Sequence, residues 1–155
     1  MPGYKFTETH ETCLREQVIT ADQPGPILRD FRVLLDFLGP KGVATAGKYN
    51  LLPLKFIKDL DSCLSQPLHL EMKRPQLRSH PYLQGLNLLL RATGLSRVEG
   101  VGSKARLVLD PTMMGQWDQL NPTEQYFNLM EAWLRFGRGE MVGERGGARD
   151  RLLVP

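Results

Sequence analysis

Apolar residues recur at helical spacing along much of the chain. The first clear stripe has offsets of 0, 1, 4, 7, 8 and 11 and consists of Ile27, Leu28, Phe31, Leu34, Leu35 and Leu38. This spacing predicts an amphipathic helix. Pro26 suits its first turn, and Gly39-Pro40 is expected to end it. The charged residues between the apolar positions are expected to face solvent, namely Arg29, Asp30, Arg32 and Asp36.

Two further helices are expected before the period changes. Asn50 is expected to cap the first of them, which would bury Leu54, Ile57, Leu60 and Leu64. Ser79 is the expected cap of the next helix, which would end at Gly94. That helix is expected to bury Leu83, Leu86, Leu89 and Leu90. Residues 41–49 are rich in glycine and alanine and are predicted to form a loop with a short strand.

The segment after Gly94 changes to β-prone residues. Two short runs, 95–99 and 104–109, flank a glycine-rich turn and predict a β-hairpin. Asp110-Pro111 and Asn121-Pro122 then pair a capping residue with a first-turn proline, which predicts two more helices. Three helices followed by a hairpin is the order of a winged helix. The expected fold is therefore mainly α with a small β-hairpin, a winged-helix-like core plus two C-terminal helices.

The chain divides into three parts by composition. Its 155 residues suit one folded domain, which we expect over residues 26–136. Residues 1–25 are expected to form an N-terminal arm with a short helix, which packs on the domain or reaches a partner. Residues 137–155 are rich in glycine and arginine and are expected to be a flexible tail or linker. This tail suggests that the chain is the leading part of a longer protein.

Charge and cysteine content narrow the class of protein. Twenty basic and 17 acidic residues give a formal charge of +3, which permits nucleic-acid binding without requiring it. The N-terminus has no apolar signal-peptide stretch, and no apolar run has the length of about 18 residues that a bilayer requires. We therefore expect a cytoplasmic protein without membrane association, in which both cysteines are thiols.

Two functions are consistent with this fold. The outer face of the third helix is expected to present Gln84, Asn87 and Arg91, side chains that can contact guanine and adenine edges. Three basic residues of the hairpin could meet phosphates, namely Arg97, Lys104 and Arg106. However, Leu88 lies among the first three residues, which suits a protein contact better. We therefore expect an interaction module for a protein partner or for the remainder of its own chain, with duplex DNA binding as the alternative.

Catalytic and metal-binding chemistry is not expected. His10-x-x-Cys13 has a spacing found in metal sites, and Cys63 lies six residues before His69, but neither pair has a strong second pair to complete a zinc site. His80 is expected on the surface at a helix start. No nucleophile elbow or phosphate-loop signature is present. We expect no enzyme, no metal and no cofactor.

Four aromatic residues near the C-terminal helices are open to two interpretations. Trp117, Tyr126, Phe127 and Trp133 could form a stacking surface for single-stranded nucleic acid. At helical spacing such residues more often belong to a core, which is the interpretation we favour.

One family resemblance bears on these expectations. Three segments carry it: 51–55 (LLPLK), the hairpin end 107–109 (LVL), and above all 121–134 (NPTEQYFNLMEAWL). These resemble a winged-helix-like region of bacterial Ri-plasmid open-reading-frame-three-like proteins, a family of unknown function. The resemblance covers roughly residues 27–147 and implies that the region can accompany a separate domain. It implies no catalytic residues.

Overall fold

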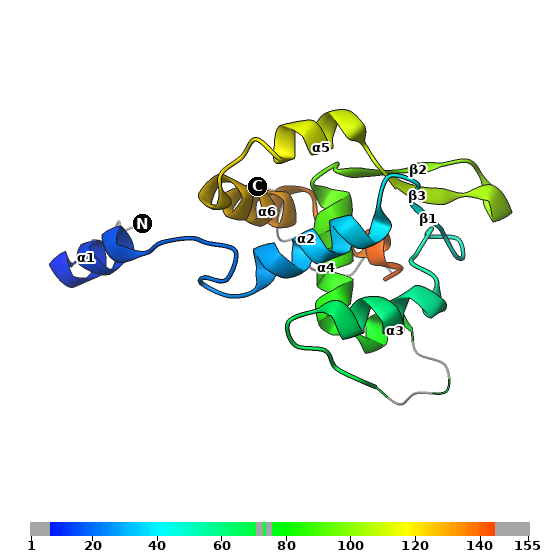
Figure 1. Ribbon diagram of the computed structural model, residues 1–155, viewed down its shortest axis with the longest axis horizontal. Coiled ribbons are helices and arrows are strands. Elements are labelled where there is room, and N and C mark those ends of the chain that lie inside the picture. The colour runs from blue at the N-terminus through cyan, green and yellow to red at the C-terminus, as the bar shows by residue number, and fades with distance from the viewer. Residues whose placement is uncertain (1–6, 71–72, 74–75, 145–155) are drawn as a thin grey trace, which may run out of the picture.

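The computed structural model describes residues 7–70, 73 and 76–144 of the chain (Figure 1). The elements follow in the order α1 (Glu8–Glu16), α2 (Ile27–Leu38), β1 (Val43–Ala44), α3 (Leu54–Cys63), α4 (Pro81–Ala92), β2 (Ser96–Glu99), β3 (Arg106–Leu109), α5 (Pro111–Trp117) and α6 (Pro122–Phe136). Three short 3₁₀ helices are η1 (Leu77–Ser79), η2 (Gly102–Lys104) and η3 (Gly139–Val142). The predicted class, mainly α with a small β-hairpin, is confirmed.

The sheet joins the predicted hairpin to the predicted short strand. Its order is β1-β3-β2, and both pairs are antiparallel. Leu107 lies opposite Val43 on one side and Val98 on the other, and it is buried in the core. Gly42 precedes β1 with a φ of +60°, and a Cβ there would lie 2.2 Å from the Leu107 carbonyl oxygen. A glycine is therefore required for β1 to approach β3 this closely.

Helix α2 forms the centre of the core. Its apolar stripe is buried as predicted, and Phe31, Leu34 and Leu35 are at most 1% exposed. α3, α4 and α6 pack around it together with β3. Trp117 of α5 covers Phe31 with an edge-to-face contact, at 5.5 Å between ring centroids. One residue that was expected to face solvent does not, since Asp30 is completely buried.

The caps of the two C-terminal helices are confirmed. The Asp110 carboxylate accepts hydrogen bonds from the backbone N–H groups of Thr112 and Met113 at the start of α5. At the start of α6, Asn121 and Glu124 form a reciprocal capping box. In each case the following proline occupies the first turn, where its missing N–H costs no hydrogen bond.

The predicted caps of α3 and α4 are wrong. α3 begins at Leu54 after Pro53, and Asn50 instead lies in a left-handed turn with a φ of 51°. Leu54 was expected in the core, but as the first residue of the helix it is 48% exposed. Ser79 belongs to η1, and α4 begins at Pro81. Both helices begin beside a proline, Pro53 for α3 and Pro81 for α4, because the residue before a proline disfavours the helical conformation.

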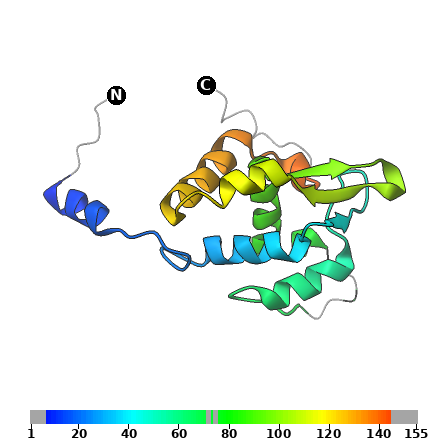
Figure 2. The ribbon, with the colours of Figure 1, turned by 45° about the horizontal axis from the view of Figure 1, so that its top comes forward.

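The two ends of the chain behave differently. In Figure 2 the described part of the N-terminal arm carries α1 away from the rest of the fold, and Ile19 near the end of the arm packs against the core. After α6, residues 137–144 do not form the expected linker, because η3 packs on α4 and Val142 is buried. Residues 145–155 of the predicted tail lie outside the described part. Within residues 7–70, 73 and 76–144, no helix has both the length and the apolar character to cross a bilayer.

Candidate functional site

The face of α4 that was expected to read DNA is covered by the protein itself. Asn87 is 1% exposed, so its amide is buried, and the expectation of a solvent-facing position is wrong. The chain returns over α4 after α6, and η3 and α6 both contact α4. The amide of Asn87 makes no hydrogen bond to any residue that the structure describes.

The two polar neighbours of Asn87 on this face bind the returning segment. The Arg91 guanidinium donates hydrogen bonds to the backbone carbonyls of Tyr49 at 2.9 Å and Met141 at 2.6 Å. Burial lowers the pKa of Arg91. The Gln84 amide donates to the Glu144 carboxylate at 2.8 Å. Both side chains therefore hold η3 and its flanking loops in place rather than pointing freely to solvent.

The three basic residues of the hairpin are not three free cations. Arg97 forms ion pairs with Glu99 and Asp110, and the hydrogen bond to Glu99 is the main cause of its raised pKa. Arg106 donates to the backbone carbonyls of Lys41 and Gly42. Lys104 is exposed. Two of the three guanidinium or ammonium groups are thus already engaged within the fold.

The histidines and cysteines do not form a reactive cluster. His80 was expected on the surface but is 3% exposed, with its Nδ1 3.4 Å from a carboxylate oxygen of Asp61. The other oxygen of Asp61 accepts hydrogen bonds from the backbone N–H groups of Leu68 and His69. Cys63 is exposed. Within the described ranges, no group of three or more His, Cys, Asp or Glu residues could hold a metal ion.

The buried carboxylate of Asp30 has a structural role. One of its oxygens accepts hydrogen bonds from the backbone N–H and the hydroxyl of Ser65, at 2.9 and 2.8 Å. Its other oxygen accepts a hydrogen bond from the Tyr82 hydroxyl at 2.9 Å. These three bonds tie α2 to the loop after α3 and to the first turn of α4, and they compensate for the loss of hydration.

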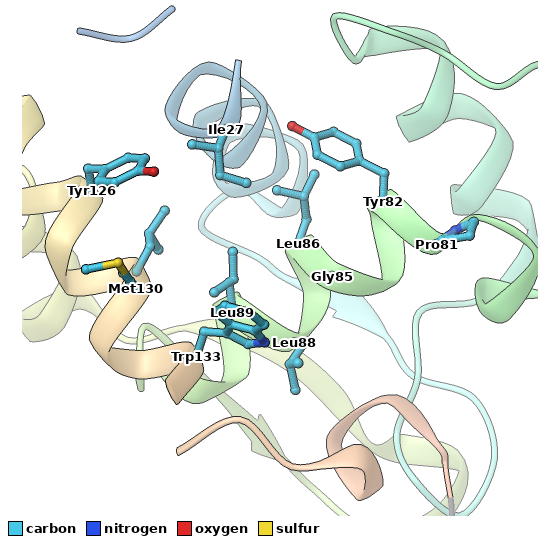
Figure 3. Close-up of a pocket in the computed structure, with 11 residues that line it drawn as sticks. Ile27, Pro81, Tyr82, Gly85, Leu86, Leu88, Leu89, Tyr126, Met130 and Trp133 are labelled. Atoms are coloured by element: carbon cyan, nitrogen blue, oxygen red, sulfur yellow. The ribbon is translucent and has the colours of Figure 1, made fainter. Parts of the chain in front are cut away.

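An apolar groove lies between α4 and α6, beside the first residue of α2. Its volume is about 500 Å³. Tyr82, Gly85, Leu88 and Leu89 of α4 line one side and Tyr126, Met130 and Trp133 of α6 the other, with Ile27 at one end (Figure 3). The Tyr82 hydroxyl is engaged by Asp30. Among the described residues that line the groove, none carries a carboxylate, imidazole, thiol or amine.

The apolar surface continues from the groove around α6. Phe127 is 51% exposed, Trp133 57% and Leu134 47%. Phe127, Met130 and Leu134 have spacings of three and four, so they lie on one face. The buried residues of this helix are Leu129 and Ala132. We call Tyr82, Met130 and Trp133 in the groove, together with Phe127 and Leu134 beside it, the α4–α6 surface.

The expectation that all four aromatic residues are core is only partly right. Trp117 is buried and Tyr126 is half-buried, whereas Phe127 and Trp133 are exposed. A sequence signal for this was present. The charged residues of α6 fall in one narrow stripe, and apolar residues cover more than half of the circumference at 3.6 residues per turn. Packing against one core requires only a stripe about 100° wide.

Comparisons with known proteins give no relative for this chain. No protein-family model matches it, and neither does any curated protein or solved structure. The resemblance to the Ri-plasmid open-reading-frame-three-like family therefore stays a prediction. The geometry of the α4–α6 surface is what remains to indicate a function.

Proposed function

We propose that this chain is a non-enzymatic interaction module that binds a protein surface through its α4–α6 surface. The observation that carries the proposal is the exposure of Phe127, Trp133 and Leu134 beside an apolar groove. Removal of such apolar surface from water by a bound partner is favourable in free energy. Contiguous exposed apolar patches on folded domains are typical of interaction sites.

The order of elements supports a winged-helix-like core for this module. α2, β1, α3 and α4 precede a hairpin, and β1 pairs with the second strand of that hairpin. Winged helices share this arrangement, and the fold alone does not fix their function. The function must therefore come from the surface that this chain leaves exposed. That surface is apolar and lies on α4 and the appended helix α6.

The alternative of duplex DNA binding has less support. A base-reading helix needs free polar side chains, whereas Asn87 is buried and Arg91 is bound to two backbone carbonyls. Affinity for DNA comes largely from cations that neutralise phosphates. Arg97 is already paired with two carboxylates. A protein partner, or the remainder of a longer chain, fits the apolar surface better than a polyanion does.

Site-specific photo-cross-linking tests the proposal with a matched pair of positions. Leu134 on α6 and Leu54 on α3 are the same residue type and are almost equally exposed, at 47% and 48%. A benzophenone amino acid introduced at each position in cells reports which surface is covered. We expect a discrete protein adduct from position 134 and none from position 54. Equal labelling at both positions, or no adduct at position 134, would contradict the proposal.

A further inference from the structure

The α4–α6 surface combines a hollow between α4 and α6 with a ridge of exposed apolar side chains on α6. Met130 and Trp133 line the groove, while Phe127 and Leu134 project beside it (Figure 3 shows the groove residues). A surface that carries both shapes can meet a copy of itself, because a two-fold axis beside α6 brings the ridge of each chain to the hollow of the other. We propose that the partner at this surface is a second copy of this chain, an inference that rests on the proposed function.

The exposed apolar area has the size that a homodimer requires. The five side chains of the surface are between 39% and 57% exposed. At about 200 Å² for each large side chain, they leave about 500 Å² of apolar area in water. A stable interface takes about 800 Å² from each partner, and about 65% of a homodimer interface is apolar. One copy of the surface therefore supplies about the apolar area that one side of a dimer buries.

The charges beside the surface favour a second copy over a strongly charged partner. Arg135 and Glu131 border Leu134 on α6 and form an ion pair at 2.6 Å. One positive and one negative charge are therefore present at this edge of the α4–α6 surface, and they balance each other. Such an edge exerts no net field that would attract an acidic or basic partner. In a two-fold contact, it allows each carboxylate to face a guanidinium of the other chain.

Gly85 gives the groove its depth. It lies in the middle of α4, where glycine is unfavourable, yet a Cβ at this position would meet no atom within 4 Å. Packing within the chain therefore does not require a glycine here. A side chain at this position would project into the groove and fill the space that a ridge from a second copy would occupy.

Sedimentation equilibrium on the full chain tests this proposal. We expect concentrated protein to have twice the 17.6 kDa mass of one chain. Gly85→Lys is expected to weaken the dimer at least tenfold, because it places a bulky charged side chain in the groove. Gly115→Lys is the matched control, since Gly115 is also an exposed helical glycine at which an added Cβ would meet no atom within 4 Å. It lies on α5, outside the groove, and should leave the dimer unchanged.

A second pair of variants covers a folding failure of the first. Leu134→Glu is expected to weaken the dimer as strongly, and Leu54→Glu is its control. Two results would overturn the second-copy proposal. One is a monomeric mass at high-micromolar concentration, and the other is a dimer whose dissociation constant is unchanged in both Gly85→Lys and Leu134→Glu. Either result is distinguishable from failure of the proposed function. If the second-copy proposal fails, a cross-link from position 134 to a different protein still shows that the surface is covered. If no cross-link forms at position 134, both proposals fail.

Discussion

Replacement of Asn87 by leucine is expected to stabilise the protein. The Asn87 side chain is 1% exposed, and its amide makes no hydrogen bond to the described residues. Leucine has the same branching at Cγ, with a tetrahedral Cγ where that of asparagine is planar. Most substitutions of buried residues destabilise a protein, which makes the expected sign unusual and therefore informative.

The magnitude follows from three effects. Burial of an unpaired amide costs about 1–3 kcal/mol, which the substitution removes. Leucine also has the better helix propensity, worth about 0.5 kcal/mol in the middle of α4. Leucine is clearly larger than asparagine, and the extra volume costs about 1 kcal/mol in a packed interior. The net expectation is an increase of about 0.5–2.5 kcal/mol in the free energy of unfolding.

Urea unfolding followed by circular dichroism measures this change. Asn128→Leu on the exposed face of α6 is the control, because it changes helix propensity without any change in burial. The control is expected to gain no more than about 0.5 kcal/mol. A loss of 1 kcal/mol or more in Asn87→Leu relative to this control would refute the reasoning. It would mean that the buried amide is hydrogen-bonded and necessary for the fold.

Two further predictions concern the network around Asp30. Asp30→Ala removes the acceptor of three hydrogen bonds and is expected to lower the free energy of unfolding by about 2–4 kcal/mol, measured by urea unfolding. A loss below about 1 kcal/mol would contradict a structural role. Burial, with the hydrogen bond to Asp30, raises the pKa of Tyr82 above its usual value of about 10. The unfolded chain therefore loses this proton first, so the stabilisation is complete below pH of about 10 and declines as pH rises further. Tyr82→Phe should flatten that decline, and an unchanged pH profile above 10 would contradict the assignment.

The helices and the hairpin were predictable because their signals are local. The stripe of α2 has helical period over three turns, and Asp110-Pro111 and Asn121-Pro122 specify the starts of α5 and α6. The starts of α3 and α4 differ from the prediction because neither Asn50 nor Ser79 caps the helix that follows it. In both cases a proline closer to the helix determined where the helical conformation begins.

The candidate site was less predictable because it depends on contacts between distant segments. Asn87 was expected on an outer face, but whether α4 has one depends on η3, about 50 residues later in the chain. Asp30 and His80 were also expected near water. Their burial depends on distant partners, namely Ser65 in the loop after α3 for Asp30 and Asp61 of α3 for His80. In contrast, the exposed face of α6 could have been inferred from the sequence. Its apolar residues extend around too much of the helix for a single core to cover.

Oxidative footprinting at Trp133 tests the central claim most directly. The chain has two tryptophans, of which Trp133 is 57% exposed and Trp117 only 6%. Hydroxyl-radical labelling of the protein in cells and of dilute purified protein compares the accessibility of each indole in the two settings. If the α4–α6 surface binds a protein, Trp133 is labelled strongly in the dilute sample and several-fold less in cells, while Trp117 is weakly labelled in both. Equal labelling of Trp133 in the two settings would contradict the claim that this surface is an interface.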